Sequence, residues 1–153
     1  MARTPKERLV SSPPLFASFK PSGIEGTKLL HVSLELDEYE AIRLADYMGM
    51  EHEQASMGMN ISRSTFTRLL ERARHKVSKL LVEGVKLEIE GGNVHFKDNL
   101  FQCLSCRHFF ALGIDKEAST CPTCNSTDLI NFARKYGHGT CCLKGSVNEN
   151  SHC

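Results

Sequence analysis

Apolar residues recur every three or four positions between residues 62 and 82, and this spacing predicts a long amphipathic helix. Ser62 is suited to cap its N-terminus, and we expect the helix to end near Val82, before Gly84. The predicted buried stripe consists of Phe66, Leu69, Leu70, Ala73, Val77, Leu80 and Leu81. The opposite side carries hydroxyl and cationic residues, namely Arg63, Ser64, Thr67, Arg68 and Arg72. The helix is therefore expected to bury one face and to expose a basic polar one.

Two shorter helices are predicted before it. Asp37 followed by Glu40 matches a capping box, and Gly49 is suited to end that helix. A second helix includes Ala55 and Met59, and Asn60 can adopt the left-handed conformation needed to leave it. Three such helices predict a mainly α fold with a helix-turn-helix, whose second helix can enter the major groove of DNA. The alternative is a plain helical hairpin with a solvated charged face.

The segments around the helices predict extended structure. Residues 1–28 are proline-rich and basic, which indicates an extended arm that either follows DNA or is a disordered tail. Residues 29–36 alternate in polarity and are suited to a short strand. Residues 85–100 contain two alternating runs around Gly91 and Gly92, which predict a β-hairpin or linker.

The composition changes at Phe101, where two Cys-x2-Cys pairs follow each other. Four cysteines at this spacing predict a tetrahedral S4 site for a structural Zn²⁺ in a small β zinc ribbon. Iron in the same geometry is an alternative, although iron-binding knuckles usually have glycine after the second cysteine, where this chain has Arg107 and Asn125. A ribbon this short is expected to need its metal to fold. The predicted ligands are Cys103, Cys106, Cys121 and Cys124.

The last segment, residues 135–153, has further metal-capable side chains at irregular spacing. They predict either a second, labile metal or redox-responsive site or, more simply, a tail with free thiols. These residues are His138, Cys141, Cys142, His152 and Cys153. The expected organisation is thus an arm (1–28), a helix-turn-helix domain (29–84), a hairpin or linker (85–100), a zinc ribbon (101–134) and this tail.

Charge is segregated along the chain although it nearly cancels overall. The 153 residues include 19 basic and 18 acidic ones, for a net charge of +1. Residues 35–53 are strongly acidic, whereas residues 62–86 are strongly basic. Such segregation favours a polyanion partner on the basic side. The sequence shows neither an apolar run long enough to span a membrane nor a signal peptide, so a cytoplasmic protein with reduced cysteines is expected.

Four segments in this order resemble the UPF0251 family, also called DUF134. They are FKPSG at residues 19–23, LELDEYEAIRLADYMGM at 34–50, ISRSTFTRLLERARHKV at 61–77 and LEIEGG at 87–92. The resemblance implies a DNA-binding protein with a helix-turn-helix like that of region 4 of sigma factors, and the later segment looks like the zinc-ribbon extension of some members. It also implies base-edge contacts from Arg63, Ser64, Thr67 and Arg68, with phosphate contacts from Arg72 and Lys76.

Together these observations lead us to expect a sequence-specific binder of double-stranded DNA, a transcriptional regulator without enzymatic activity. No nucleophile, phosphate-binding loop or open metal position is evident in the sequence. Two other roles remain open: an adapter that docks on RNA polymerase or another protein, and a metal or redox sensor that uses the cysteine-containing tail. A homodimer is compatible with the sequence.

Overall fold

The computed structural model describes residues 7–138 and Cys142, and it divides them into two compact units. The first unit contains residues up to Leu9 and Phe16–Val94. The second contains Val10–Leu15 and the chain from His95 onward. The predicted boundary between residues 84 and 100 is therefore close to the observed one, but the assignment of residues 10–15 to the second unit was not predicted.

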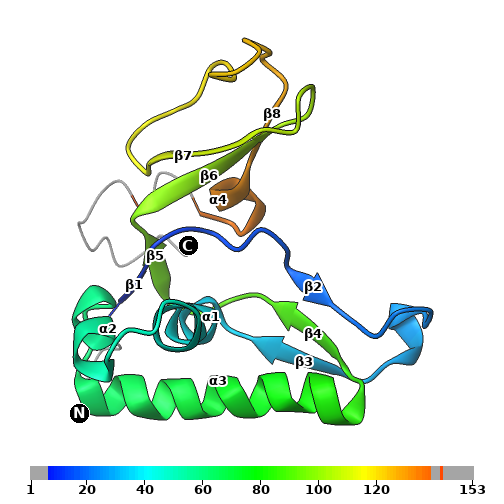
Figure 1. Ribbon diagram of the computed structural model, residues 1–153, viewed down its shortest axis with the longest axis vertical. Coiled ribbons are helices and arrows are strands. Elements are labelled where there is room, and N and C mark those ends of the chain that lie inside the picture. The colour runs from blue at the N-terminus through cyan, green and yellow to red at the C-terminus, as the bar shows by residue number, and fades with distance from the viewer. Residues whose placement is uncertain (1–6, 139–141, 143–153) are drawn as a thin grey trace. The chain divides into compact units, whose positions relative to one another are not determined.

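The first unit combines helices with a sheet. Its elements are β2 (Ser18–Phe19), η1 (Gly26–Lys28), β3 (His31–Leu34), α1 (Leu36–Ile42), the π-helical turn η2 (Arg43–Tyr47), α2 (His52–Gly58), α3 (Arg63–Glu83) and β4 (Lys86–Ile89). β4 lies in the middle of the sheet, antiparallel to β2 and parallel to β3. In Figure 1, α3 runs along one side of this unit and packs against α1, α2 and the sheet.

The core of this unit forms where the three helices meet. Phe66, Leu69 and Leu70 of α3 are at most 1% exposed and pack with apolar residues of α1, η2 and α2. Ser62 caps α3, because its hydroxyl accepts a hydrogen bond from the backbone N–H of Thr65. Gly84 ends the helix in a left-handed conformation with φ +68°. The predicted bounds of α3 are thus confirmed at both ends. Its predicted buried face is confirmed up to Ala73, whereas Val77 and Leu80 are half-buried and Leu81 is exposed.

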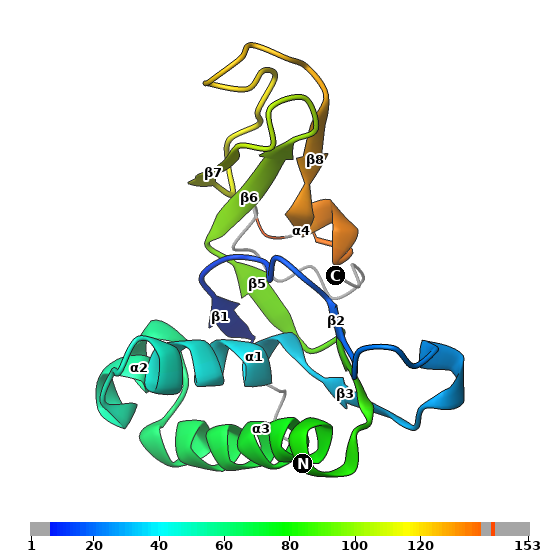
Figure 2. The ribbon, with the colours of Figure 1, turned by 45° about the vertical axis from the view of Figure 1, so that its right-hand side comes forward.

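The second unit is built on a three-stranded antiparallel sheet. β6 (Asp98–Cys103) lies between β7 (Phe109–Gly113) and β8 (Leu129–Asn131), and the short helix α4 (Phe132–Lys135) follows β8 (Figure 2). Buried Asn99 joins β6 to this helix: its side chain accepts the N–H of Ala133 and donates to the side chain of Asn131. The chain passes between the two units within β1 (Arg8–Val10) and β5 (Val94–Phe96).

The prediction of a mainly α protein, with a three-helix helix-turn-helix domain followed by a zinc ribbon, is wrong. Helix accounts for 36% and strand for 23% of the described residues, and the strands form three sheets. The helices do not form a domain by themselves, because α3 packs on β3 and β4 of the sheet as well as on α1 and α2. Parallel pairing of β3 with β4 joins segments separated by α1, η2, α2 and α3, which local periodicity cannot reveal.

Three local predictions also need correction. Residues 7–28 are not an extended arm, because they contain β1, β2 and η1, with Val10, Pro13 and Pro14 buried. Residues 85–100 do not form a hairpin, since β4 and β5 belong to different sheets. α1 is capped by Glu35 in a capping box with Glu38, so the cap lies two residues before the predicted Asp37. Residues 1–6 lie outside the described part.

Candidate metal centre and basic helix

The N-terminal half of α3 exposes the polar residues that the sequence predicted to contact DNA. Arg63, Ser64, Arg68 and Arg72 are exposed, and Thr67 is half-buried beside them. Within residues 7–138 and Cys142, the structure records no ion pair for Arg63, Arg68 or Arg72. Three guanidinium groups therefore face solvent from the same half of the helix. This surface, from Arg63 to Arg72, is called the basic face below.

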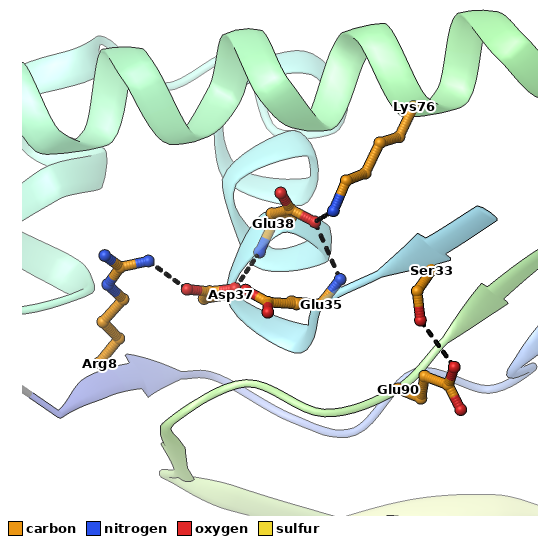
Figure 3. A network of polar contacts seen from close by, with 7 residues as sticks. All are labelled: Arg8, Ser33, Glu35, Asp37, Glu38, Lys76 and Glu90. Carbon is orange, nitrogen blue, oxygen red and sulfur yellow. Dashed lines mark hydrogen bonds and ion pairs between the residues drawn. The ribbon is translucent and has the colours of Figure 1, made fainter.

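The next turn of α3 is different, because its cations are paired. The ammonium group of Lys76 donates to buried Glu38 of α1 at 2.6 Å, and the guanidinium of Arg74 binds both carboxylate oxygens of Asp46. In Figure 3, Lys76 reaches across from α3 to Glu38, which also accepts the backbone N–H of Glu35 at 2.9 Å. A contact between Lys76 and a phosphate would compete with this ion pair.

Glu38 belongs to a group of acidic side chains at the start of α1. Its neighbour Asp37 is 2% exposed and is paired with Arg8 (Figure 3). An open depression next to this network is lined by residues of both signs: Glu35, Glu38, Glu71, Arg72, His75 and Lys76. The acids of α1 thus neutralise one part of the cationic stretch on α3.

The structure also shows a residue beside the basic face to which the sequence assigned no role. Nδ1 of His52, the first residue of α2, lies 3.0 Å from the hydroxyl oxygen of Thr67. The ring of His52 packs edge-on against Phe66, with centroids 5.4 Å apart. The two residues are fifteen positions apart on different helices, and periodicity predicts the faces of helices but not such a pair.

The predicted cysteines converge in the second unit. Cys103 ends β6 and Cys106 follows in the turn to β7, while Cys121 and Cys124 lie in the loop between β7 and β8. The two turns have the same backbone hydrogen bonds. The N–H of Cys103 donates to the carbonyl of His108 and that of Cys121 to Ser126, while the carbonyls of these cysteines accept from Arg107 and Asn125. Each turn therefore presents two thiols to a common point.

The four sulfur atoms are spaced as metal ligands. All four Sγ atoms lie within 4.8 Å of one another, and the Cys103–Cys124 and Cys106–Cys121 pairs are each 3.6 Å apart. A tetrahedral ion with metal–sulfur bonds of about 2.3 Å requires sulfur atoms about 3.8 Å apart. The distances also exclude disulfide bonds, whose sulfur atoms are about 2.05 Å apart. The cluster is therefore compatible with a bound metal ion.

The electrostatics of the cluster lower the pKa of Cys103 and Cys121 and raise that of Cys106 and Cys124. Hydrogen bonds from the backbone N–H groups of Cys106 and Ser105 lower the pKa of Cys103 to about 6. The N–H of His108 lowers the pKa of Cys106, but burial and the three neighbouring sulfur atoms outweigh it and raise this pKa to about 12. Four thiolates at this spacing need a cation to offset their repulsion.

The residues after the second cysteines do not distinguish zinc from iron. Arg107 and Asn125 have φ of +65° and +59°, the left-handed conformation that glycine adopts readily. Both turns therefore reach this conformation without glycine. The lack of glycine at these two positions therefore does not disfavour iron.

Part of the predicted tail cluster is also close together. Nδ1 of His138 lies 3.4 Å from the sulfur of Cys142, and burial, followed by the charge of His95, lowers the pKa of His138. His138 is 5% exposed and packs edge-on against Phe96. Cys141, His152 and Cys153 lie outside the described residues. Among the helices of the described part, none is both long and apolar enough to cross a bilayer.

Comparison with known proteins identifies relatives over nearly the whole chain. A UPF0251 protein of Pelotomaculum thermopropionicum is 44% identical over 128 residues, which cover 84% of this chain and 96% of the relative. A UPF0251 protein of Moorella thermoacetica is 38% identical over 153 residues, covering 99% of this chain and all of the relative. No solved structure matches the chain significantly.

The family model described as "Protein of unknown function DUF134" matches residues 1–97, and so covers the whole first unit and residues 10–15 and 95–97 of the second. The match to the Moorella protein extends beyond it through the cysteine turns. The match to the family model and the identity to these relatives confirm the resemblance that was based on residues 19–23, 34–50, 61–77 and 87–92. The chain belongs to the UPF0251 (DUF134) family.

Proposed function

We propose that this protein binds double-stranded DNA in a sequence-specific way through the basic face of α3 and acts as a transcriptional regulator in the cytoplasm. The observation that carries the proposal is the exposure of Arg63, Arg68 and Arg72 without an ion-pair partner in the described part of the chain. The opposite side of the same helical segment is completely buried, so this surface is held rigidly by the core.

Physical chemistry supports a helix of this kind as a DNA reader. The major groove admits an α-helix, and arginine can donate two hydrogen bonds to the O6 and N7 atoms of guanine. Arg63 and Arg68 are assigned to base edges together with Ser64 and Thr67, and Arg72 is assigned to phosphate. Lys76 is a weaker candidate for a phosphate contact than the sequence suggested, since Glu38 holds its ammonium group at 2.6 Å.

The test is selection from a random duplex library by the full, metal-loaded chain at about 50 and 200 mM salt, a range over which phosphate contacts lose affinity. Arg63→Ala and Arg68→Ala should each cost about 1–3 kcal/mol of specific binding. The matched control is Lys28→Ala/Lys116→Ala, which removes two exposed cations that do not belong to the basic face. Selection of a motif that only the arginine variant loses supports the proposal. Binding without selection, or equal loss in the control, contradicts it.

We assign Zn²⁺ to the four-cysteine cluster, in a structural role. The four thiolates fill a tetrahedral shell and leave no position for a substrate, as in structural zinc sites. Elemental analysis of protein purified without added metal tests the identity of the ion. One zinc per chain and no visible absorption are expected. A red protein with iron–thiolate absorption would show that the bound ion is iron and not zinc.

An adapter role is the second candidate, and exposed apolar side chains favour it. Tyr47 and Met48 at the end of η2 are 83% and 55% exposed, and Met57 of α2 is 72% exposed. Such residues suit a protein partner, for example RNA polymerase. Absent or salt-insensitive DNA binding, together with saturable binding to purified RNA polymerase that Met57→Asp abolishes, would favour this role.

The third candidate is regulation of DNA binding by metal or oxidant, and the 3.4 Å contact between His138 and Cys142 favours it. Cys141→Ser/Cys142→Ser should then abolish any response of DNA affinity to Zn²⁺ or peroxide. An unchanged response in this variant would remove the idea.

A further inference from the structure

The contact between His52 and Thr67 determines which groups Thr67 can offer to a ligand. The Thr67 hydroxyl donates to the carbonyl oxygen of Arg63, one helical turn earlier, at 3.1 Å. Nδ1 of His52 lies 3.0 Å from the same hydroxyl oxygen. Two protein groups from two helices thus hold one side-chain atom at the edge of the basic face.

The protons of this pair can be assigned. A hydroxyl group has one hydrogen and two lone pairs, and the hydrogen of Thr67 is directed to Arg63. Both contacts are hydrogen bonds at the same time only when Thr67 donates to Arg63 and His52 donates through an Nδ1–H group, because two acceptors cannot form a hydrogen bond with each other. One of the two lone pairs of the hydroxyl is then used as well. Thr67 then has no hydrogen-bond donor left, and what remains for a ligand is one lone pair of the hydroxyl and the Cγ2 methyl.

The position of His52 is itself fixed by packing. Its ring lies edge-on to Phe66 at an interplanar angle of 65°, and Phe66 is fully buried in the core. Phe66 directly precedes Thr67 in α3, so the same helical turn orients the histidine and receives its hydrogen bond. The arrangement does not depend on a flexible surface side chain.

We infer that His52 is a positioning residue for base recognition, which turns the hydroxyl of Thr67 into the protein and leaves its methyl group to read a thymine. The inference rests on the proposed DNA-binding function. Thymine is the base that presents a methyl group in the major groove, and threonine methyl groups contact it favourably. A free hydroxyl would instead accept or donate a hydrogen bond to a base edge. It would discriminate poorly between base pairs, because serine and threonine hydroxyls can bind several bases.

The experiment compares the selected DNA motifs of five full-length, metal-loaded proteins. Thr67→Val keeps the methyl group without the hydroxyl, whereas Thr67→Ser keeps the hydroxyl without the methyl. His52→Asn places an amide N–H near the position of Nδ1, and His52→Ala removes the donor. Wild-type protein is the reference. Circular dichroism of each variant shows whether it is folded.

We expect a preference for thymine at one base pair in the wild type, retained in Thr67→Val and His52→Asn. Thr67→Ser should lower that preference about fourfold, as expected for the loss of one buried methyl group. His52→Ala should lower it at the same base pair and leave the rest of the motif unchanged. A merely structural role of His52 would weaken binding to all sequences alike.

Three results would overturn the inference. A motif in which Thr67→Val loses the preference and Thr67→Ser keeps it would mean that the hydroxyl reads the base. If the wild type selects a motif and no base preference in it changes when Thr67 or His52 is substituted, the role of the pair is refuted and the proposed function is left intact. A wild type that selects no motif would refute both. Separately, ¹⁵N NMR of the free protein should show His52 protonated at Nδ1; an Nε2–H tautomer would contradict the proton assignment.

Discussion

Replacing Lys76 by methionine tests whether the ion pair with Glu38 stabilises the first unit. Glu38 is almost completely buried, with a side-chain exposure of 2%, whereas that of Lys76 is 28%. Methionine keeps the apolar length of the lysine chain and removes its charge. The buried carboxylate of Glu38 then retains the backbone N–H of Glu35 at 2.9 Å and loses its ion-pair partner (Figure 3).

Removing one partner of a fully buried ion pair destabilises a protein by about 3–5 kcal/mol. The penalty should be smaller here because Lys76 is partly solvated and water can reach the vacated place. We therefore expect Lys76→Met to lower the free energy of unfolding by about 2–3 kcal/mol. The double variant Glu38→Gln/Lys76→Met removes both charges, and it should lie within about 1 kcal/mol of wild type.

Urea unfolding of the full metal-loaded chain, followed by circular dichroism at a helical wavelength, measures these differences. The signal reports mainly on α3, which is the longest helix of the described part. Lys79→Met is the matched control, because Lys79 lies on the same helix and has no recorded ion pair in the described part. A double variant as unstable as Lys76→Met, or a Lys76→Met protein as stable as the control, would refute the reasoning.

Three further predictions concern the metal, acid and a helix end. Removal of the metal with a strong chelator should unfold the second unit and spare α3, so NMR signals of residues 98–135 should change while those of 63–83 persist; unchanged signals in the cysteine turns would contradict a structural metal. The hydrogen bond from Arg74 lowers the pKa of Asp46 in the folded protein. This pair therefore stabilises the fold fully above the pKa of aspartate in the unfolded chain, about 4, and the stabilisation is lost as the pH falls through the pKa of Asp46 in the folded protein. Asp46→Asn should therefore flatten slightly the acid dependence of the urea midpoint below pH 4, and an unaltered dependence would exclude a role for this pair. Gly84→Ala should lower the free energy of unfolding by about 1–2 kcal/mol, because alanine is strained at φ +68° although its methyl group would meet only Pro21 at 3.7 Å; equal stability of the two proteins would show that the helix end relaxes.

Predictions from the sequence succeeded where the signal is local. The apolar spacing around Phe66, the hydroxyl of Ser62 and the glycine at position 84 determine α3 through neighbours in the sequence, and the structure has that helix. Asn60 adopts the expected left-handed conformation with φ +58°. The cysteine spacing likewise predicted a convergence of four sulfur atoms, because each turn involves only four residues.

Predictions failed where short strands pair over long distances. β2 has two residues, which is too few for alternation to reveal a strand. Alternation at residues 29–36 did predict a strand where β3 lies, but it could not reveal that β3 pairs with β4. The two glycines after β4 have positive φ, as a hairpin would require, but β4 pairs with β2 and β3 instead. Because a strand can pair with any matching edge, the turn residues alone could not decide between these arrangements.

The charge pattern shows how the fold changes the meaning of a sequence signal. The acidic stretch at residues 35–53 and the basic one at 62–86 suggested a basic face for a polyanion, yet part of this charge is neutralised within the protein. Glu38 pairs with Lys76 and Asp46 with Arg74, so the acids of α1 and η2 cover the middle of α3. Among the arginines of α3, those without a recorded partner in the described part are Arg63, Arg68 and Arg72, all in its first half. Pairing between the two stretches thus leaves the accessible guanidinium groups next to Thr67, which we infer reads the base, and His52, which we infer positions it.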